Sequence, residues 1–332
     1  MNPMFELKSC APGDALFTAM LPRIYGSGVP ETVVQQPETD HLAQCWVVLE
    51  KGEPVGRVGF YHNREILYQD QPTAQLGLFE CMNAPEAAAV LFEKAQEEAR
   101  KTGAVWLLGP LNGTTWNRYR FLTDKGIEPP FLGEPTHQDY YPELWEEAGF
   151  VPVGAYLSNV APLDPATEKD TDFWHRNHLR VETVLPQNLA QVLTDVYPMC
   201  TAAFETAPFY SSISREQFIQ KLSAVTPLLE AGCTKVVYDA SGNAVAFALC
   251  YPDPLSQNRT ILKTAARVKN APVSGIINAL YREIAVPSLW LDRTQLIHAF
   301  IHEANSSATR SGHFGGETMR RYTLFGKPTI VC

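Results

Sequence analysis

The sequence of 332 residues lacks any uninterrupted hydrophobic stretch of about 18 residues, the minimum that a membrane-spanning helix requires. Its first residues mix polar and apolar side chains, so we expect no secretory signal peptide and a cytoplasmic location. Runs of lysine or arginine are also missing, and the formal net charge is −9. These absences predict a protein that binds neither membranes nor nucleic acids.

Cysteine pairs at metal-binding spacing are absent as well. The seven cysteines are scattered along the chain, and none belongs to a C-x-x-C motif. This pattern predicts reduced thiols and argues against a disulfide framework or a structural zinc site. No cysteine lies in a basic helix-start context, so a cysteine nucleophile is not expected. On a strand, His298 and His302 would lie about 13 Å apart, too far to share a metal ion, and we expect no metal.

What the sequence does contain is one order of elements that occurs twice. Two β-rich runs flank a turn at Gly52, and two more flank a turn at Gly242, 190 residues later. A further apolar run follows each hairpin, and the next helices begin near Glu86 and Gly275, 189 residues apart. A near-constant offset indicates a duplicated domain. We therefore predict two units of hairpin, strand, helix and strand, each built on a mixed sheet of its own.

The length and the composition along the chain divide it into two domains. We place the first domain at residues 1–160 and the second at 179–332. Residues 161–178 contain proline, aspartate and lysine without an apolar period, which is typical of a linker.

The loop before the helix of the second half is a candidate anion site. Gly275 permits close approach to the backbone, Ser274 offers a hydroxyl group, and Arg267 and Lys269 supply positive charge. Free N–H groups and the helix dipole bind phosphate groups at such positions. The alternative is that Ser274 and Gly275 only cap the helix at a tight turn.

The equivalent helix of the first half begins differently. Glu86 already places a negative charge at its N-terminus, and Pro85 removes one N–H donor. A phosphate-bearing ligand is therefore predicted in the second half and not in the first.

A general base is indicated at the end of the predicted strand 295–301. His302 ionises near neutral pH, and Glu303 follows it directly. The alternative is a histidine that caps a helix or faces solvent. Glu80 ends the matching strand of the first half, where it is a vestigial base or a plain strand-end carboxylate.

Aromatic residues are dense in and after the long segment that follows the first unit. They either wall a substrate cleft between the halves or cover the core. The residues are Trp116, Tyr119, Phe121, Phe131, Tyr140 and Tyr141.

The C-terminal part of the chain contains His302, then Asn305 and Ala308, then Gly315 ahead of a predicted final strand over 320–325. This order resembles the closing motif of GNAT-type N-acetyltransferases, in which a strand ends at an asparagine and a helix with alanine three residues later follows. Residues 140–156 resemble a relic of the same motif, and residues 109–112 are similar to a bacterial group of GNAT-like proteins.

The resemblance covers most of the chain and implies an α/β fold of two tandem GNAT-like domains. It implies that acetyl-CoA or another acyl-CoA donates an acyl group to a small amine, an amino acid or a peptide amine. Such a substrate would be the main partner, and a homodimer is left open. Together with the loop, the resemblance assigns cofactor binding to Arg267, Val268, Lys269, Ser274, Gly275, Ile276 and Asn305, and catalysis to His302 and Glu303.

Three positions depart from the family pattern. Ile277 replaces the second glycine of the phosphate loop, Pro272 stands where arginine or glutamine is usual, and Gly312 occupies the place of the tyrosine acid. They favour a second interpretation, a GNAT-fold protein that binds or senses a ligand without catalysis. A third is an aminoacyl-transferase-like tandem GNAT enzyme, although the acidic net charge argues against a tRNA donor.

Overall fold

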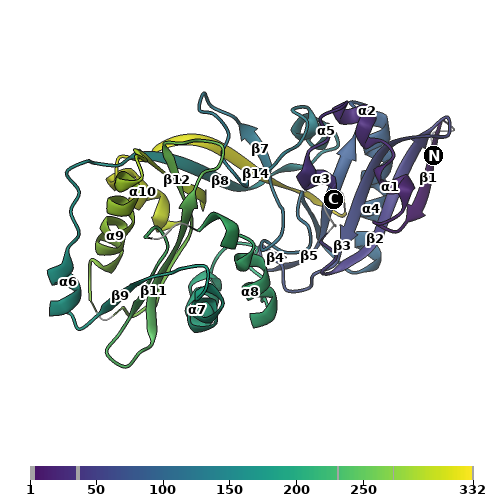
Figure 1. Cartoon of the computed structure of the whole chain (residues 1–332). Helices are drawn as coiled ribbons and strands as arrows, with labels where there is room; N and C mark the ends of the chain where they lie inside the picture. Colours follow the sequence, from purple (N-terminus) through teal and green to yellow (C-terminus); the bar gives the residue numbers. More distant parts are fainter. Residues whose placement is uncertain (1–3, 35–37, 230–231, 272, 331–332) are drawn as a thin grey trace.

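The strands of the chain form one continuous mixed sheet, which helices cover (Figure 1). The computed structural model describes residues 4–34, 38–229, 232–271 and 273–330. The path along the sheet is β1-β2-β3-β5-β6-β14-β8-β13-β12-β11-β10-β9, with β4 beside β5 and β7 beside β14. Within the described residues, no helix is both long enough and apolar enough to cross a membrane.

The first half follows the predicted order of hairpin, strand, helix and strand. Strands β2 and β3 form the antiparallel hairpin. Strand β5 then leads through the crossover helix α4 to β6, and these two strands are parallel. The elements are β1 (Phe5–Cys10), α1 (Ala15–Thr18), α2 (Leu21–Tyr25), α3 (Glu31–Val34), β2 (Leu42–Glu50), β3 (Glu53–Tyr61), β4 (Leu67–Tyr68), β5 (Gln71–Cys81), α4 (Pro85–Lys101), β6 (Trp106–Gly109), β7 (Phe121–Asp124), α5 (Tyr141–Glu147) and β8 (Val151–Pro162).

The second half repeats this order. Strands β10 and β11 form the hairpin. Strand β12 then leads through α9 to β13, and these two strands are parallel. The elements are α6 (Thr171–Arg176), β9 (Arg180–Thr183), α7 (Leu189–Phe204), α8 (Arg215–Ser223), η1 (Thr226–Leu228), β10 (Lys235–Tyr238), β11 (Ala244–Pro252), β12 (Arg259–Arg267), α9 (Ile276–Trp290), β13 (Gln295–His302), α10 (Ser306–His313) and β14 (Glu317–Pro328).

In the second half, helices cover both faces of the sheet, and alternate side chains of one strand pack against each of them. Phe247 and Leu249 of β11 pack with α7, whereas Ala246 and Ala248 pack with α9. Because successive strand residues point to opposite faces, one apolar strand supplies two cores. In the first half, α4 buries its apolar stripe on β2, β3 and β5.

The prediction of a separate sheet for each half is wrong, because the halves exchange their last strands. Strand β8 follows the first unit in sequence but pairs with β13, with Val160 opposite Ile297. Strand β14 ends the chain but pairs with β6, with Gly326 opposite Leu108. The two strands also pair with each other. Strands β6, β14, β8 and β13 are thus hydrogen-bonded side by side in this order. The sheet therefore has no exposed edge where the halves meet.

The predicted linker contains the short helix α6. Its Trp174 is buried in the core of the second half, and the indole nitrogen donates to Glu283 at 3.0 Å. Asp170 caps the helix by accepting from the backbone of Phe173. The part of the predicted linker without regular structure is therefore limited to about 164–169, where the chain is mostly exposed.

Cutting the chain in this stretch is expected to leave the two halves together. A protease site inserted at 164–166 would release no fragment, since β8 stays paired with β13 and β14 with β6. Gel filtration of the cut protein without denaturant should give one peak that contains both fragments. Two separate, folded peaks would contradict the strand exchange.

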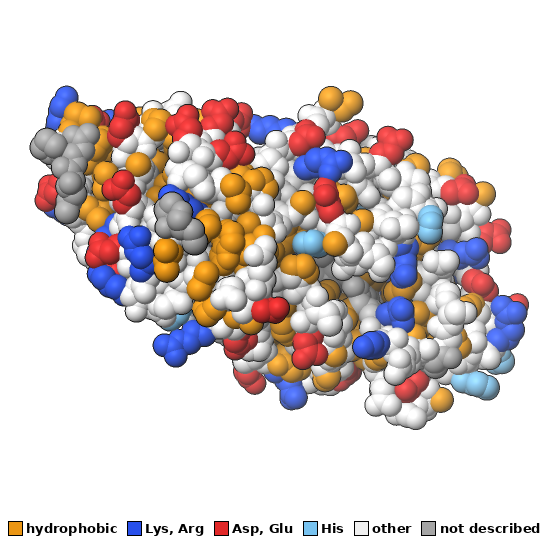
Figure 2. All heavy atoms as spheres, turned by 180° about the vertical axis from the view of Figure 1, so that it is seen from behind, with side chains coloured by type: hydrophobic (Ala, Val, Ile, Leu, Met, Phe, Trp, Pro, Cys, Tyr) orange, Lys and Arg blue, Asp and Glu red, His pale blue; other side chains and the backbone are white. Residues whose placement is uncertain are grey.

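Figure 2 shows that acidic and basic side chains are interspersed over the rear face of the molecule. This distribution agrees with the net charge of −9 and offers no broad basic surface on that face for nucleic acid.

Candidate functional site

A large cavity of about 2360 Å³ lies between the two halves. Its walls come from β12, β13 and α10 of the second half, from α7 and α8, and from the segment 110–121 of the first half. The segments of both halves thus meet around one space.

One wall is opened by the separation of β12 and β13. The two strands pair from Arg259–Gln295 to Leu262–His298, and no further. Beyond that point β12 stays with β11, where Lys263 forms a bulge, and β13 stays with β8, where Phe300 has φ of 59°. Residues on both sides of this second-half split line the cavity.

The corresponding split of the first half is filled by its own chain. Residues 109–112 continue along β5 after β6 ends, and Leu111 donates its backbone N–H to Leu76 at 2.6 Å. The side-chain oxygen of Asn112 accepts from the backbone N–H of Leu78 at 3.0 Å. Asn112 also packs on Gly77, where an added Cβ would lie 2.0 Å from that oxygen. The segment thus fills the space between the strands, although Asn112 and the end of β5 still line the large cavity.

The predicted anion loop opens on a second cavity of about 640 Å³. Gly275 has φ of 83° and is the N-cap of α9, whose first turn no side chain caps. Ser274 and Gly275 are exposed, whereas the side chain of Ile276 is buried in the core, so only its backbone faces the cavity. Pro272 lies outside the described residues.

Three cationic side chains and one histidine surround this second cavity, and no acidic residue is among the described residues that line it. Arg267 and Lys269 were predicted from the loop, and Arg267 donates to the backbone oxygens of Val268 and Lys269. Arg310 and His313 of α10 were missed. Their signal in the sequence is a spacing of three residues, which places both on one side of a helix.

The first half lacks such a site. Helix α4 begins with Pro85 and carries Glu86 in its first turn, as predicted. Neither residue lines the cavities described above. Glu80, at the end of β5, accepts from the hydroxyl groups of Tyr25 and Tyr141, and burial raises the pKa of its carboxyl group. It is a buried carboxylate that both tyrosines hold in place, and it lines the large cavity.

His302 lies half-buried at the end of β13 and lines the large cavity. Its Nδ1 accepts from the backbone N–H of Ala304 at 3.1 Å, and its ring contacts Tyr156 edge-on at 4.9 Å. Burial lowers the pKa of His302, although Glu303 raises it and Arg120 lowers it further. The imidazole is therefore neutral at pH 7, as a base must be.

Glu303 follows His302 but lies outside the cavity. Its side chain is exposed, pairs with Arg321 and is absent from the cavity wall. It acts on His302 through its charge alone. Asn305 lines the cavity, but its side chain caps α10 by accepting from the backbone of Ser307.

Another group stands near the vacant tyrosine position at Gly312. Phe314 stacks on Tyr281 of α9 with ring centroids 3.9 Å apart. Both residues line the large cavity, and burial raises the pKa of Tyr281, so its phenol stays protonated. Tyr281 was not predicted, because its helical spacing alone marks it as a core residue.

The predicted aromatic group divides between the two roles considered. Trp116, Tyr119 and Phe121 line the large cavity. Phe131 and Tyr141 are buried in apolar cores, and Tyr140 packs beside one of them. Within the described residues, no group of three or more His, Cys, Asp or Glu side chains is arranged to bind a metal.

No protein-family model matches the chain, and no curated protein matches it by sequence. Solved structures do match. A tandem GNAT protein from the clavulanic acid biosynthesis pathway is 13% identical, with a TM-score of 0.57 over 99% of both chains. A GCN5-related N-acetyltransferase from Sphaerobacter thermophilus is 14% identical, with a TM-score of 0.54 over 100% of this chain and 98% of its own. A third, from Anabaena variabilis, is 11% identical, with a TM-score of 0.60 over 99% and 74%.

Proposed function

We propose that this chain, which has the tandem GNAT fold, transfers an acyl group from coenzyme A to an amine at a site in its second half. The observation that carries the proposal is the contrast between the strand splits. Both regions line the large cavity, but the strands of the second-half split are free of each other there, whereas residues 109–112 bond to β5 and fill the counterpart. Beside this split, a helix N-terminus and three cationic side chains offer a place for a pyrophosphate.

Each residue then has a defined role. The amides of 274–276, with Arg267 and Lys269, bind the pyrophosphate, and Val268 and Asn305 line the path to the split. His302 removes a proton from the amine, whose nitrogen attacks the thioester carbon. The carbon–sulfur bond breaks, and Tyr281 donates its proton to the leaving thiolate. The phenolate regains a proton from solvent.

The second interpretation is a protein that binds an acyl-CoA without turnover. Gly312 and Ile277 favour it, because they depart from the pattern of active family members. Binding and turnover therefore have to be measured separately.

Binding of acetyl-CoA is expected to stabilise the protein. At a concentration of 100 times Kd, a ligand that binds only the folded state adds about 2.7 kcal/mol to the free energy of unfolding. Thermal unfolding with acetyl-CoA, longer acyl-CoAs and free coenzyme A measures this effect, with ATP as a control for polyphosphates. Release of thiol with a panel of amines then tests turnover. Binding without turnover supports the second interpretation, and no binding of any thioester contradicts both.

A further inference from the structure

We propose that the acceptor carries a carboxylate next to its amine, as an amino acid does, and that Arg120 and Lys263 bind this carboxylate inside the large cavity. The inference rests on the proposed function and narrows its substrate class. It comes from a buried arginine that lacks an anionic partner.

Arg120 lies in the wall of the large cavity and is only 7% exposed. Its Nη1 donates to the hydroxyl of Tyr119 at 2.6 Å, and its buried Nε has no hydrogen-bond partner. No carboxylate within the described part of the chain forms an ion pair with it. Aromatic rings surround the guanidinium instead, within 5.4 Å of their centroids: Tyr119, Tyr156, Phe300 and Tyr322.

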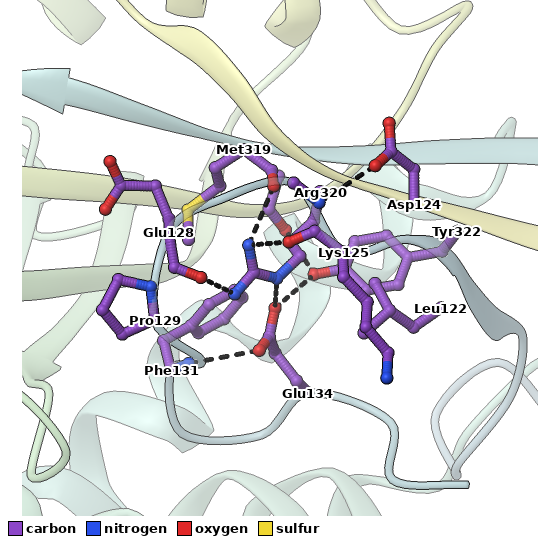
Figure 3. A network of polar contacts seen from close by, with 12 residues as sticks. Leu122, Asp124, Lys125, Glu128, Pro129, Phe131, Glu134, Met319, Arg320 and Tyr322 are labelled. Atoms are coloured by element: carbon purple, nitrogen blue, oxygen red, sulfur yellow. Dashed lines mark hydrogen bonds and ion pairs between the residues drawn. The ribbon is translucent and has the colours of Figure 1, made fainter. Parts of the chain in front are cut away.

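Two other buried arginines of the chain, Arg320 and Arg259, form ion pairs with glutamates. Figure 3 shows Arg320, whose Nε pairs with Glu134 at 2.8 Å and whose other nitrogens bind backbone oxygens, including that of Glu128 at 2.6 Å. Arg259 pairs with Glu128 and also binds a backbone oxygen. A buried charge costs several kcal/mol unless it is paired. An anion that enters the cavity would therefore supply the ion-pair partner that Arg120 lacks within the described residues.

A second cation points to the same place. Lys263, at the bulge of β12, lies 4.5 Å from the centroid of Phe300, and Arg120 lies 4.5 Å from the same centroid. Surrounding protein and the charge of Arg120 lower the pKa of Lys263 to about 8. The two cations repel each other, and a carboxylate that enters the cavity reduces that repulsion.

The anion site adjoins the predicted base. Tyr156 is the link, because its ring contacts His302 at 4.9 Å and Arg120 at 4.7 Å. A carboxylate on Arg120 and the ring of His302 thus border the same part of the cavity, beside Tyr156. Glu134 contacts Tyr322 nearby, but it is already paired with Arg320. A planar guanidinium binds a carboxylate through two parallel hydrogen bonds, which fixes the orientation of the acceptor.

The test compares amino acids with their amides, which differ only in the carboxylate. Calorimetry of the protein saturated with coenzyme A gives their affinities, and turnover with acetyl-CoA gives kcat/KM. We expect at least one acid to be preferred over its amide by about 100-fold. In Arg120→Met the preference should fall to within a few-fold, with unchanged affinity for acetyl-CoA, and Arg120→Lys should retain part of it.

Lys263→Met serves as a second variant should Arg120→Met not fold, and it should reduce the same preference by about tenfold. If acids and amides bind and react equally, or if Arg120→Met keeps the full preference, the inference is wrong while the acyltransferase proposal stands. If acetyl-CoA itself does not bind, the acyltransferase proposal fails first. Binding of a carboxylate without any binding of acetyl-CoA would keep the anion site and remove only its role in acyl transfer.

Discussion

Replacing Gly275 with glutamate is expected to weaken coenzyme A binding by about two orders of magnitude. The change recreates in the second half the negative charge that Glu86 places at the first turn of α4. Two unit charges about 5 Å apart at an effective dielectric constant of 20 repel by about 3 kcal/mol. This corresponds to about a 100-fold increase in Kd. Calorimetric titration with coenzyme A measures the change directly.

The matched control is Gly275→Gln, which has the same length without the charge. Any side chain at this position shares the strain of φ of 83°, and a Cβ would meet only Phe173, at 3.7 Å. Both variants should therefore unfold at similar temperatures, and only the glutamate should weaken binding. Equal affinities in the two variants would mean that the pyrophosphate binds elsewhere.

Replacing His302 with alanine is expected to lower kcat by about 10²- to 10⁴-fold, the usual contribution of one general base. The affinity for acetyl-CoA should stay within a few-fold, because His302 lies at the split and not at the anion loop. His175→Ala is the control, since this histidine is exposed on α6 and lines neither cavity. If His302→Ala reacts at the rate of the unsubstituted protein, His302 is not the base. Its role is then structural, as the acceptor of the backbone N–H of Ala304.

The pH profile of the parent enzyme gives an independent check. Burial lowers the pKa of His302 below its ordinary value of 6.5. The base is therefore neutral above that lowered pKa, and kcat/KM should be constant at neutral pH. It should fall as the pH drops through the lowered pKa, because protonated imidazole accepts no proton. A limb that instead falls well above pH 6.5 would assign the base to another group.

The sequence predicts those features of the fold that depend on local pattern. Hairpins, crossover helices and the offset near 190 residues follow from periods and turns that neighbouring residues determine. The exchange of β8 and β14 is not predictable in this way. Their alternating side chains would suit either sheet, and only the long-range pairing of Val160 with Ile297 and of Gly326 with Leu108 selects the partner.

The candidate site shows the same division. The anion loop is evident from Gly275 and its basic neighbours, because a helix N-terminus has a local signature. Arg120 has none, since it lies in an irregular segment and its meaning depends on rings that come from distant strands. Asn112 is similar, because only the fold brings it against Gly77. The roles of such side chains depend on neighbours that are distant in the sequence, so they become visible only in the folded structure.

The exchanged strands also make each half of the chain depend on the other. Strand β8 is encoded with the half whose own split is closed, yet it carries Tyr156 against His302. Deleting that half would leave β13 unpaired along one side and would remove the ring that contacts His302. The chain can therefore lose neither half without opening the sheet of the other.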